Sequence, residues 1–199
     1  MKETAAEEAV LPPARGEGEH PSLALANSFV TLPGGQAVDF LETPAQANRW
    51  LTRHGLAPID AGMLEMCTAR LRSLREQTRS LFASRAAGLP ASPAAVAAIN
   101  DSMTRVPTAP LLRWDERGGP YRVALHPTTG ILAHALAALA TDAADLLTGP
   151  DAERLTACGS TPCNRFLLRH GRRHWCSTRC GDRARAARAY ARRARPGTE

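Results

Sequence analysis

Near its C-terminus the chain places four of its five cysteines in one segment, CGSTPCNRFLLRHGRRHWCSTRC, residues 158–180. These four are Cys158, Cys163, Cys176 and Cys180, spaced C-x4-C-x12-C-x3-C. Two pairs of thiolates at this spacing are typical of a tetrahedral zinc site, in which four sulfur ligands leave no open position on the metal. The spacing therefore predicts a structural Zn2+ rather than a catalytic one. Two disulfides, or four unrelated thiols, are the alternatives.

The residues around these cysteines indicate how a small module over 151–199 would fold. Residues 159–162 are small turn formers, and the twelve residues between the two pairs have room for a short hairpin. Ser177 is expected to cap a helix, so that Cys176 and Cys180 face the same side of its first turn. A knuckle, a hairpin and a ligand-bearing helix describe a treble-clef-like zinc finger with four cysteine ligands. Because such a module has almost no core, the metal would supply most of its folding free energy.

Charge is distributed unevenly along the chain. Residues 1–150 hold 13 basic and 15 acidic side chains, whereas residues 151–199 hold 12 arginines and 4 acidic side chains. The basic excess therefore lies beside the cysteines, where it would attract a polyanion such as DNA. The arginines expected to contact nucleic acid are Arg172, Arg173, Arg183, Arg185, Arg188 and Arg192. Because Lys2 is the only lysine, the choice of arginine is uninformative by itself, and a solvated or protein-binding face is the alternative.

The preceding residues predict a flexible tail over 1–21 and a helical domain over 22–150. Helix caps and apolar spacing predict helices over 44–54, 60–88, 92–105 and 130–147. The second of these, the longest, is expected to begin at Asp60. Alternating apolar residues over 111–125 predict a β-hairpin, whereas 22–41 is either a hairpin or a helix followed by a loop. The expected fold class is mainly α with a β-hairpin, followed by the finger.

Two further features bear on compartment and chemistry. The most apolar stretch, 130–147, carries His134, Asp142 and Asp145, which favours a buried helix over a membrane span. The first residues are acidic and hold no apolar run, so we expect no signal peptide and a cytoplasmic location. Cys67 lies on the apolar stripe of the long helix, where a buried structural thiol is expected.

The C-terminal residues resemble the CGNR zinc-finger family. The resemblance rests on the paired cysteines, Phe166, Arg172-Arg173-His174-Trp175-Cys176 and Cys180-Gly181-Asp182-Arg183. The chain departs from the family pattern at Asp182, where the family has asparagine, and at Leu168, where it has an acidic residue. The preceding domain resembles the ABATE domain. That resemblance rests on Leu25-Ala26-Asn27-Ser28, Val38-Asp39-Phe40-Leu41 and Trp50-Leu51.

The resemblance implies a bacterial stress-induced transcription regulator with a zinc-bound finger and no catalytic residues. The finger would bind DNA, and the helical domain would sense a small molecule or form a homodimer. Asn27, in the shared motif, is the expected ligand-binding residue. The alternative is a zinc-stabilised protein- or RNA-interaction protein, in which the finger docks on the helical domain and buries its basic helix. An enzyme is not expected, because Asn27, Trp50, His126 and His134 form no triad, metal cluster or glycine-rich phosphate loop.

Overall fold

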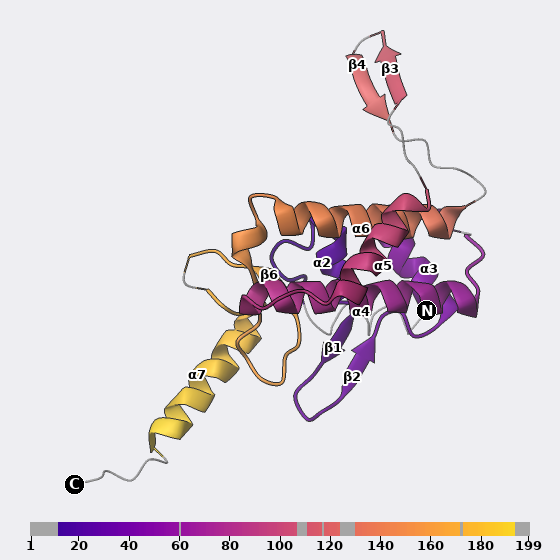
Figure 1. Ribbon diagram of the computed structural model, residues 1–199. Coiled ribbons are helices and arrows are strands. Elements are labelled where there is room, and N and C mark those ends of the chain that lie inside the picture. Colours follow the sequence, from indigo (N-terminus) through magenta and orange to yellow (C-terminus); the bar gives the residue numbers. More distant parts are fainter. Residues whose placement is uncertain are drawn as a thin grey trace.

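The computed structural model describes residues 12–59, 61–106, 111–116, 118–123, 130–171 and 173–193. Five helices form its body (Figure 1): α2 (Pro21–Ala26), α3 (Pro44–Arg53), α4 (Glu65–Ala87), α5 (Pro93–Thr104) and α6 (Ile131–Thr148). Helix α4 contacts the other four, and the apolar core lies between them. The expected fold class is confirmed, and three two-stranded antiparallel sheets are present among the described residues.

Helix α4 starts later than its predicted N-cap. Its N-cap is Leu64, and residues 61–64 have no helical structure; Asp60 lies outside the described residues. Gly62 has a φ of 62°, a left-handed backbone conformation that interrupts a right-handed helix. The predicted apolar stripe is buried from Leu71 onward, whereas Leu64 is 62% exposed. Cys67, in the first turn of α4, is half-buried rather than buried.

The caps of two other helices follow their sequence signals. Thr43 accepts a hydrogen bond from the amide of Gln46, and the Gln46 side chain accepts one from the Thr43 amide, which completes a capping box at the start of α3. Ser92 accepts from the amide of Ala95 at the start of α5. Both helices have proline in their first turn, as predicted.

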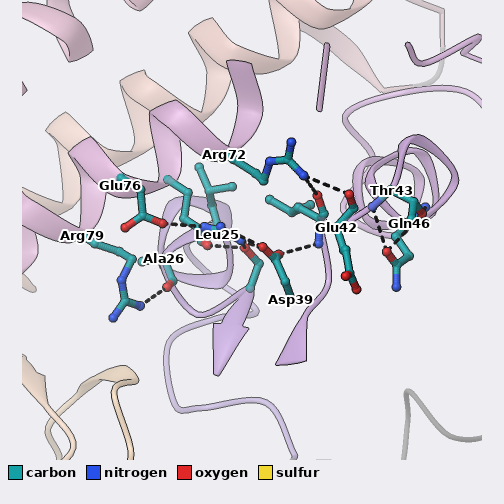
Figure 2. Close-up of polar contacts among 12 residues, drawn as sticks. Leu25, Ala26, Asp39, Glu42, Thr43, Gln46, Arg72, Glu76 and Arg79 are labelled. Atoms are coloured by element: carbon teal, nitrogen blue, oxygen red, sulfur yellow. Dashed lines mark hydrogen bonds and ion pairs between the residues drawn. The ribbon is translucent and has the colours of Figure 1, made fainter. Parts of the chain in front are cut away.

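The segment 22–41 contains both of the structures that its sequence allowed. Helix α2 is followed by the antiparallel pair β1 (Phe29–Thr31) and β2 (Ala37–Asp39). Arginines on one face of α4 hold this segment (Figure 2): Arg72 donates to the carbonyls of Leu41 and Glu42, and Arg79 donates to that of Ala26. Between them, Arg75 forms a bidentate ion pair with Asp39, at 2.6 and 3.0 Å.

The predicted hairpin over 111–125 is present as β3 (Leu111–Asp115) and β4 (Gly119–Val123), paired in antiparallel register. It extends away from the helical body in Figure 1. Leu112, Trp114 and Tyr121 are 71%, 74% and 51% exposed, so their alternation does not reflect burial against the body. The end of the predicted segment, 124–125, lies outside the described residues.

Helix α6 is long and apolar enough to cross a membrane by length and composition alone. In the structure it packs against α2, α4 and α5 and buries a face that includes Ala135, Leu139 and Leu146. Asp142 accepts hydrogen bonds from the backbone amide of Ser22 at 2.8 Å and from the His20 ring at 3.1 Å. Helix α6 is therefore a core helix of the fold, as its charged residues predicted.

The C-terminal region begins with a 3-10 turn (Ala152–Arg154) and the antiparallel pair β5 (Leu155–Ala157) and β6 (Phe166–Leu168), and ends with α7 (Thr178–Arg193). The β5–β6 pair packs on the body through contacts of β5 with α4 and of β6 with α2. Helix α7 points away from the body in Figure 1. The finger is therefore docked at one end and projects at the other.

Residues 12–20 differ from the flexible tail expected over 1–21. They form turns against the finger, where Ala14 is 2% exposed and the Arg15 carbonyl accepts from the Leu168 amide at 2.9 Å. Gly16 has a φ of 96°, and a Cβ there would lie 2.6 Å from the Leu168 side chain. The tail prediction rested on Glu, Gly and Pro content, and here the glycine permits a close backbone approach. Residues 1–11 lie outside the described residues.

Candidate metal centre and basic surface

Four cysteine sulfur atoms meet between the β5–β6 turn and the first turn of α7. Their Sγ atoms all lie within 4.8 Å of one another. The Sγ of Cys176 lies 3.6 Å from that of Cys163 and 3.6 Å from that of Cys180. A tetrahedral zinc with Zn–S bonds of about 2.3 Å requires sulfur–sulfur separations of about 3.8 Å, so this donor set fits the ion. Among the described residues, no other cluster of His, Cys, Asp or Glu is placed to hold a metal.

Backbone hydrogen bonds bring the two cysteine pairs together. The Cys158 amide donates to the Arg165 carbonyl at 2.8 Å, which closes the turn between β5 and β6. The Gly159 amide donates to the His174 carbonyl at 2.9 Å, and the Cys176 amide donates to the Cys158 sulfur at 3.5 Å. These bonds tie the turn to the segment before α7. The Ser177 hydroxyl accepts from the Cys180 amide at 3.2 Å, so the predicted cap of the ligand-bearing helix is present.

The hairpin expected between the two cysteine pairs is replaced by a different pairing. Strand β6 lies in that interval, but it pairs backward with β5, and only an isolated bridge joins His170 to Arg173 around Gly171. The reason is burial: Phe166, Leu167 and Leu168 are 5%, 2% and 0% exposed. So apolar a strand is more stable against the body core than in a small exposed hairpin.

Crowding splits the pKa values of the thiols. Hydrogen bonds from Cys163 and Cys176 lower the pKa of Cys158 to about 2, whereas the hydrogen bond with Cys158 raises that of Cys163 to about 12. The pKa of Cys176 is also raised by its hydrogen bonds with these neighbours. Four thiolates this close repel one another, so a divalent cation is needed to keep all of them ionised. The chemistry of the site thus matches its geometry.

A buried arginine connects this centre to the N-terminal segment. Arg165 is 4% exposed and pairs with Glu17 at 2.7 Å, and its guanidinium also donates to the Pro12 carbonyl at 2.9 Å. The same guanidinium lies 4.0 Å from the Cys176 sulfur. Since four thiolates and one Zn2+ carry a net charge of −2, a buried cation at this distance is electrostatically favourable. Sequence reasoning missed this role, because no local signal separates Arg165 from the exposed arginines.

Asn27 has a structural role at the junction between the body and the finger. It is 5% exposed, and its side-chain oxygen accepts from the Phe166 amide at 2.7 Å. Its side-chain nitrogen donates to the Phe166 carbonyl at 2.8 Å and to Glu17 at 2.6 Å. The side-chain amide of Asn27 therefore pairs with both backbone groups of Phe166, 139 positions away, as the backbone of a neighbouring strand would. Both polar atoms of the side chain are engaged within the fold, and the expected ligand-binding role of Asn27 stays a prediction.

The basic helix is exposed along almost its whole length. The buried residues of α7 are Cys180 and Gly181, both in its first turn. Of the arginines expected to contact nucleic acid, Arg185, Arg188 and Arg192 are exposed on α7 and Arg183 is half-buried there. Arg173 is exposed on the isolated bridge, whereas Arg172 lies outside the described residues. Four of the six expected arginines therefore lie on α7, and Arg173 lies on the bridge that precedes it.

Two contacts order the start of this helix. The guanidinium of Arg188 lies 5.5 Å from the centre of the Trp175 ring, a cation–π arrangement. Asp182, which replaces the asparagine of the family pattern, forms an ion pair with Arg185 one turn along α7. Both partners of this pair are exposed, at 68% and 61%. The replacement therefore places a carboxylate beside one of the candidate contact residues.

Trp50 and His134, the other candidate residues that the structure describes, lie on different helices, α3 and α6. Trp50 is 8% exposed and its ring lies 4.2 Å from that of His54. Burial, with a smaller contribution from Arg53, lowers the pKa of His54 to about 4. His134 is half-buried on α6, and His126 lies outside the described residues.

Comparison with known families agrees with the geometry. Residues 19–150 match the ABATE family, described as "Putative stress-induced transcription regulator", and residues 154–193 match the CGNR zinc finger. Neither is a family of enzymes. The comparison with curated proteins gave no match. The chain therefore belongs to the ABATE family, and it carries a C-terminal CGNR zinc finger that binds zinc.

Proposed function

We propose that this protein is a DNA-binding transcription regulator, in which the four clustered cysteines hold the zinc and α7 carries the DNA contacts. The observation that carries the proposal is the exposure of α7: beyond its first turn, none of its described residues is buried. A rigid, solvent-facing helix anchored at one end is the element that proteins most often insert into a major groove.

The dimensions and charges of α7 support this use. Its 16 residues correspond to a length of about 24 Å at 1.5 Å per residue. Arg185, Arg188 and Arg192 are three, four and seven positions apart, so they lie on one face. Asp182 is the only acidic residue of the helix. Such a face would bind backbone phosphates with little dependence on sequence and with a steep dependence on salt.

The alternative, a protein- or RNA-interaction module with a buried basic helix, fits the structure less well. The finger does dock on the helical body, as that hypothesis expected, but it does so through β5 and β6. The docked face and the basic helix are therefore at different ends of the module. This arrangement favours DNA contact through α7, and the docked β5–β6 pair would hold α7 in position.

The test compares two double variants of the zinc-loaded full-length protein on a random-sequence duplex. Arg188→Ala/Arg192→Ala removes two cations from α7. As a matched control, Arg53→Ala/Arg105→Ala removes two exposed cations, one from α3 and one from the C-cap of α5. We expect the α7 variant to flatten the plot of log affinity against log salt by about 2, and the control to leave it unchanged. Absence of duplex binding by the unmodified protein at low salt would refute the proposal.

Sensing by the helical region is the second part of the proposal. A hollow of about 320 Å³ lies between α4, α5 and α6, with an apolar wall that includes Leu89, Val96 and Leu147. Its size suits a small apolar effector. A thermal-shift screen of such compounds tests this, because Val96→Trp should fill the hollow and abolish any stabilisation seen with the unmodified protein. Homodimer formation stays a prediction, to be checked by sedimentation equilibrium.

A further inference from the structure

A second concave feature lies on the finger itself. It is a hollow of about 510 Å³ between residues 12–20, the N-terminal segment, and the start of α7. Its polar wall comes from two stretches of chain that are far apart in the sequence, the N-terminal segment and residues 170–185. The residues concerned are Arg15, His170, Arg173, Ser177, Thr178 and Arg185. Neither aspartate nor glutamate is among the residues that line it.

The three arginines make this hollow strongly cationic. Arg15, Arg173 and Arg185 are all exposed, so each is free to turn toward a ligand. Within the described part of the chain, Arg15 and Arg173 form no ion pair, and Arg185 pairs with Asp182 alone. Three guanidinium groups at the rim of one concave surface repel one another. An anion between them would relieve that repulsion.

The donors around the hollow match a phosphate group. A guanidinium presents two parallel N–H groups that fit two phosphate oxygens, and hydroxyls such as those of Ser177 and Thr178 donate to a third. The positive end of the α7 dipole adds to the same potential. Leu167, Leu168 and Trp175 contribute apolar parts of the wall.

We propose that this hollow binds a phosphate group, and that its occupant is a phosphate of the DNA backbone. The identity of the occupant rests on the proposed function, whereas the phosphate site itself does not. The new element is Arg15, which lies outside the matched finger, at 154–193. The N-terminal segment thus contributes a cation to a site that the finger alone would leave incomplete.

A different role for these arginines is to balance the zinc centre. Cys176 also lines the hollow, and four thiolates with one Zn2+ carry a net charge of −2. Arg165 already lies 4.0 Å from the Cys176 sulfur and is buried, so it is placed to offset part of that charge from inside. If Arg15 served the same purpose, its removal would weaken zinc binding and leave phosphate binding unchanged.

Asp182 provides a variant with the opposite expected effect. Its ion pair with Arg185 competes with any anion in the hollow. Replacing it with asparagine, as in the family pattern, removes the competing charge and keeps the size of the side chain. Asp182→Asn should therefore bind phosphate a few-fold more tightly, which no general loss of folding would imitate.

The experiment uses the zinc-loaded full-length protein with Arg15→Ala, Arg15→Lys and Asp182→Asn, and Arg105→Ala as the control. Arg15→Ala leaves intact the backbone carbonyl that accepts from Leu168. In the first arm, inorganic phosphate replaces chloride at constant ionic strength, and NMR follows the arginine Nε–H and Trp175 indole signals. In the second arm, a random-sequence duplex is titrated over a range of salt concentrations.

We expect saturable phosphate-induced shifts at Trp175 and the hollow arginines in the unmodified protein. These should weaken about tenfold in Arg15→Ala, less in Arg15→Lys, and not at all in Arg105→Ala. In the duplex arm, Arg15→Ala should flatten the salt dependence by about 0.9, the value for one phosphate contact.

The phosphate arm tests the site itself, and the duplex arm tests whether DNA is its occupant. Absence of saturable shifts, or equal shifts in Arg15→Ala and the control, overturns the phosphate site whether or not DNA binds. Weaker zinc binding with unchanged phosphate shifts in Arg15→Ala overturns it in favour of charge balance. Phosphate shifts without duplex binding overturn the DNA occupant and the proposed function together, and leave a site for a phosphorylated small molecule.

Discussion

The helical body and the zinc finger are stabilised in different ways, although they pack against each other through one interface. The body buries Leu, Ala, Phe and Ile side chains contributed by five helices. The second cluster of buried residues, in the finger, consists of Ala14, Leu167 and three of the four cysteines. A core whose main members are metal ligands has little apolar surface to bury. The comparison teaches that apolar burial folds the body and that metal coordination folds the outer half of the finger.

The inner half of the finger belongs to the body. Leu155, Phe166 and Leu168 are part of the main core, and the Phe166 ring packs edge-on against Phe82 with centroids 5.9 Å apart. The boundary that the sequence suggested at 151 therefore does not separate two cores. The real division lies within the finger, between the buried β5–β6 pair and the projecting α7.

The largest effect should come from removing a metal ligand. Cys176→Ser should abolish zinc binding and disorder α7, while the helical body stays folded. Structural zinc supplies about 10–16 kcal/mol of apparent binding free energy in isolated fingers, more than any single apolar contact. Zinc content and far-ultraviolet circular dichroism measure the outcome. Cys67→Ser, in α4, is the control that should retain one zinc per chain. Full zinc affinity in Cys176→Ser would contradict the assigned site.

Truncating a buried side chain of the body should lower the free energy of unfolding and leave zinc binding unchanged, which is the reverse of the effect of losing a metal ligand. Leu139 is fully buried in α6, and Leu139→Ala should lower the free energy of unfolding by about 2–5 kcal/mol through lost burial and a residual cavity. Zinc affinity should not change. Denaturant unfolding and a competitive zinc titration report the two quantities separately. Leu112→Ala, at a position 71% exposed on β3, should change stability by less than about 0.5 kcal/mol. A parallel loss of zinc affinity in Leu139→Ala would break the comparison.

The interface between the body and the finger is tested at Asn27. Asn27→Ala leaves the amide and carbonyl of Phe166 and the carboxylate of Glu17 without their buried partner, which should cost about 1–3 kcal/mol. The Phe166 amide should also exchange with solvent faster, because the finger is less firmly docked. Unfolding and hydrogen exchange measure these effects. Asn100→Ala, on the exposed side of α5, is the matched control. Equal exchange rates in the two variants would show that Asn27 does not hold the junction.

The smallest effect at neutral pH concerns His54 in the body, because it develops only on acidification. Its pKa is lowered to about 4 in the folded protein, so the unfolded chain binds a proton more readily between pH 6.5 and 4. Stability contributed by the neutral ring is therefore present above pH 6.5 and is lost as the pH falls, at no more than about 1.4 kcal/mol per pH unit. Comparison with His54→Asn isolates this contribution, since zinc loss affects both proteins alike. Identical pH profiles for the two proteins would contradict the burial of the ring.

Short-range features were predictable from the sequence because their physics is local. The capping box at Thr43 depends on residues three apart, and so does the cap at Ser92. The cysteine spacing carries its own ligand geometry, and the Ser177 cap follows from the helix that it begins. The start of α4 was predicted wrongly at Asp60, because a good capping residue does not outweigh a left-handed glycine two positions later.

The roles of Asn27 and Arg165 were not predictable, because each depends on partners distant in the sequence. Asn27 completes its hydrogen bonds with a strand 139 positions away, and Arg165 finds Glu17 148 positions away. Strand β6 likewise pairs with β5 rather than folding back toward Cys176, because two of its three side chains, Phe166 and Leu168, are buried in the body core. No local pattern contains these partners.

The sequence by itself determined that this protein has a zinc module and a basic helix, because ligand spacing and charge density are properties of consecutive residues. Only the tertiary structure decided which basic residues remain available to a partner. Arg165 is buried beside the metal ligands, whereas Arg15 joins Arg173 and Arg185 around one hollow. The physical reason is that burial and electrostatic potential depend on how segments remote in sequence pack together. The sequence around each residue does not indicate that packing.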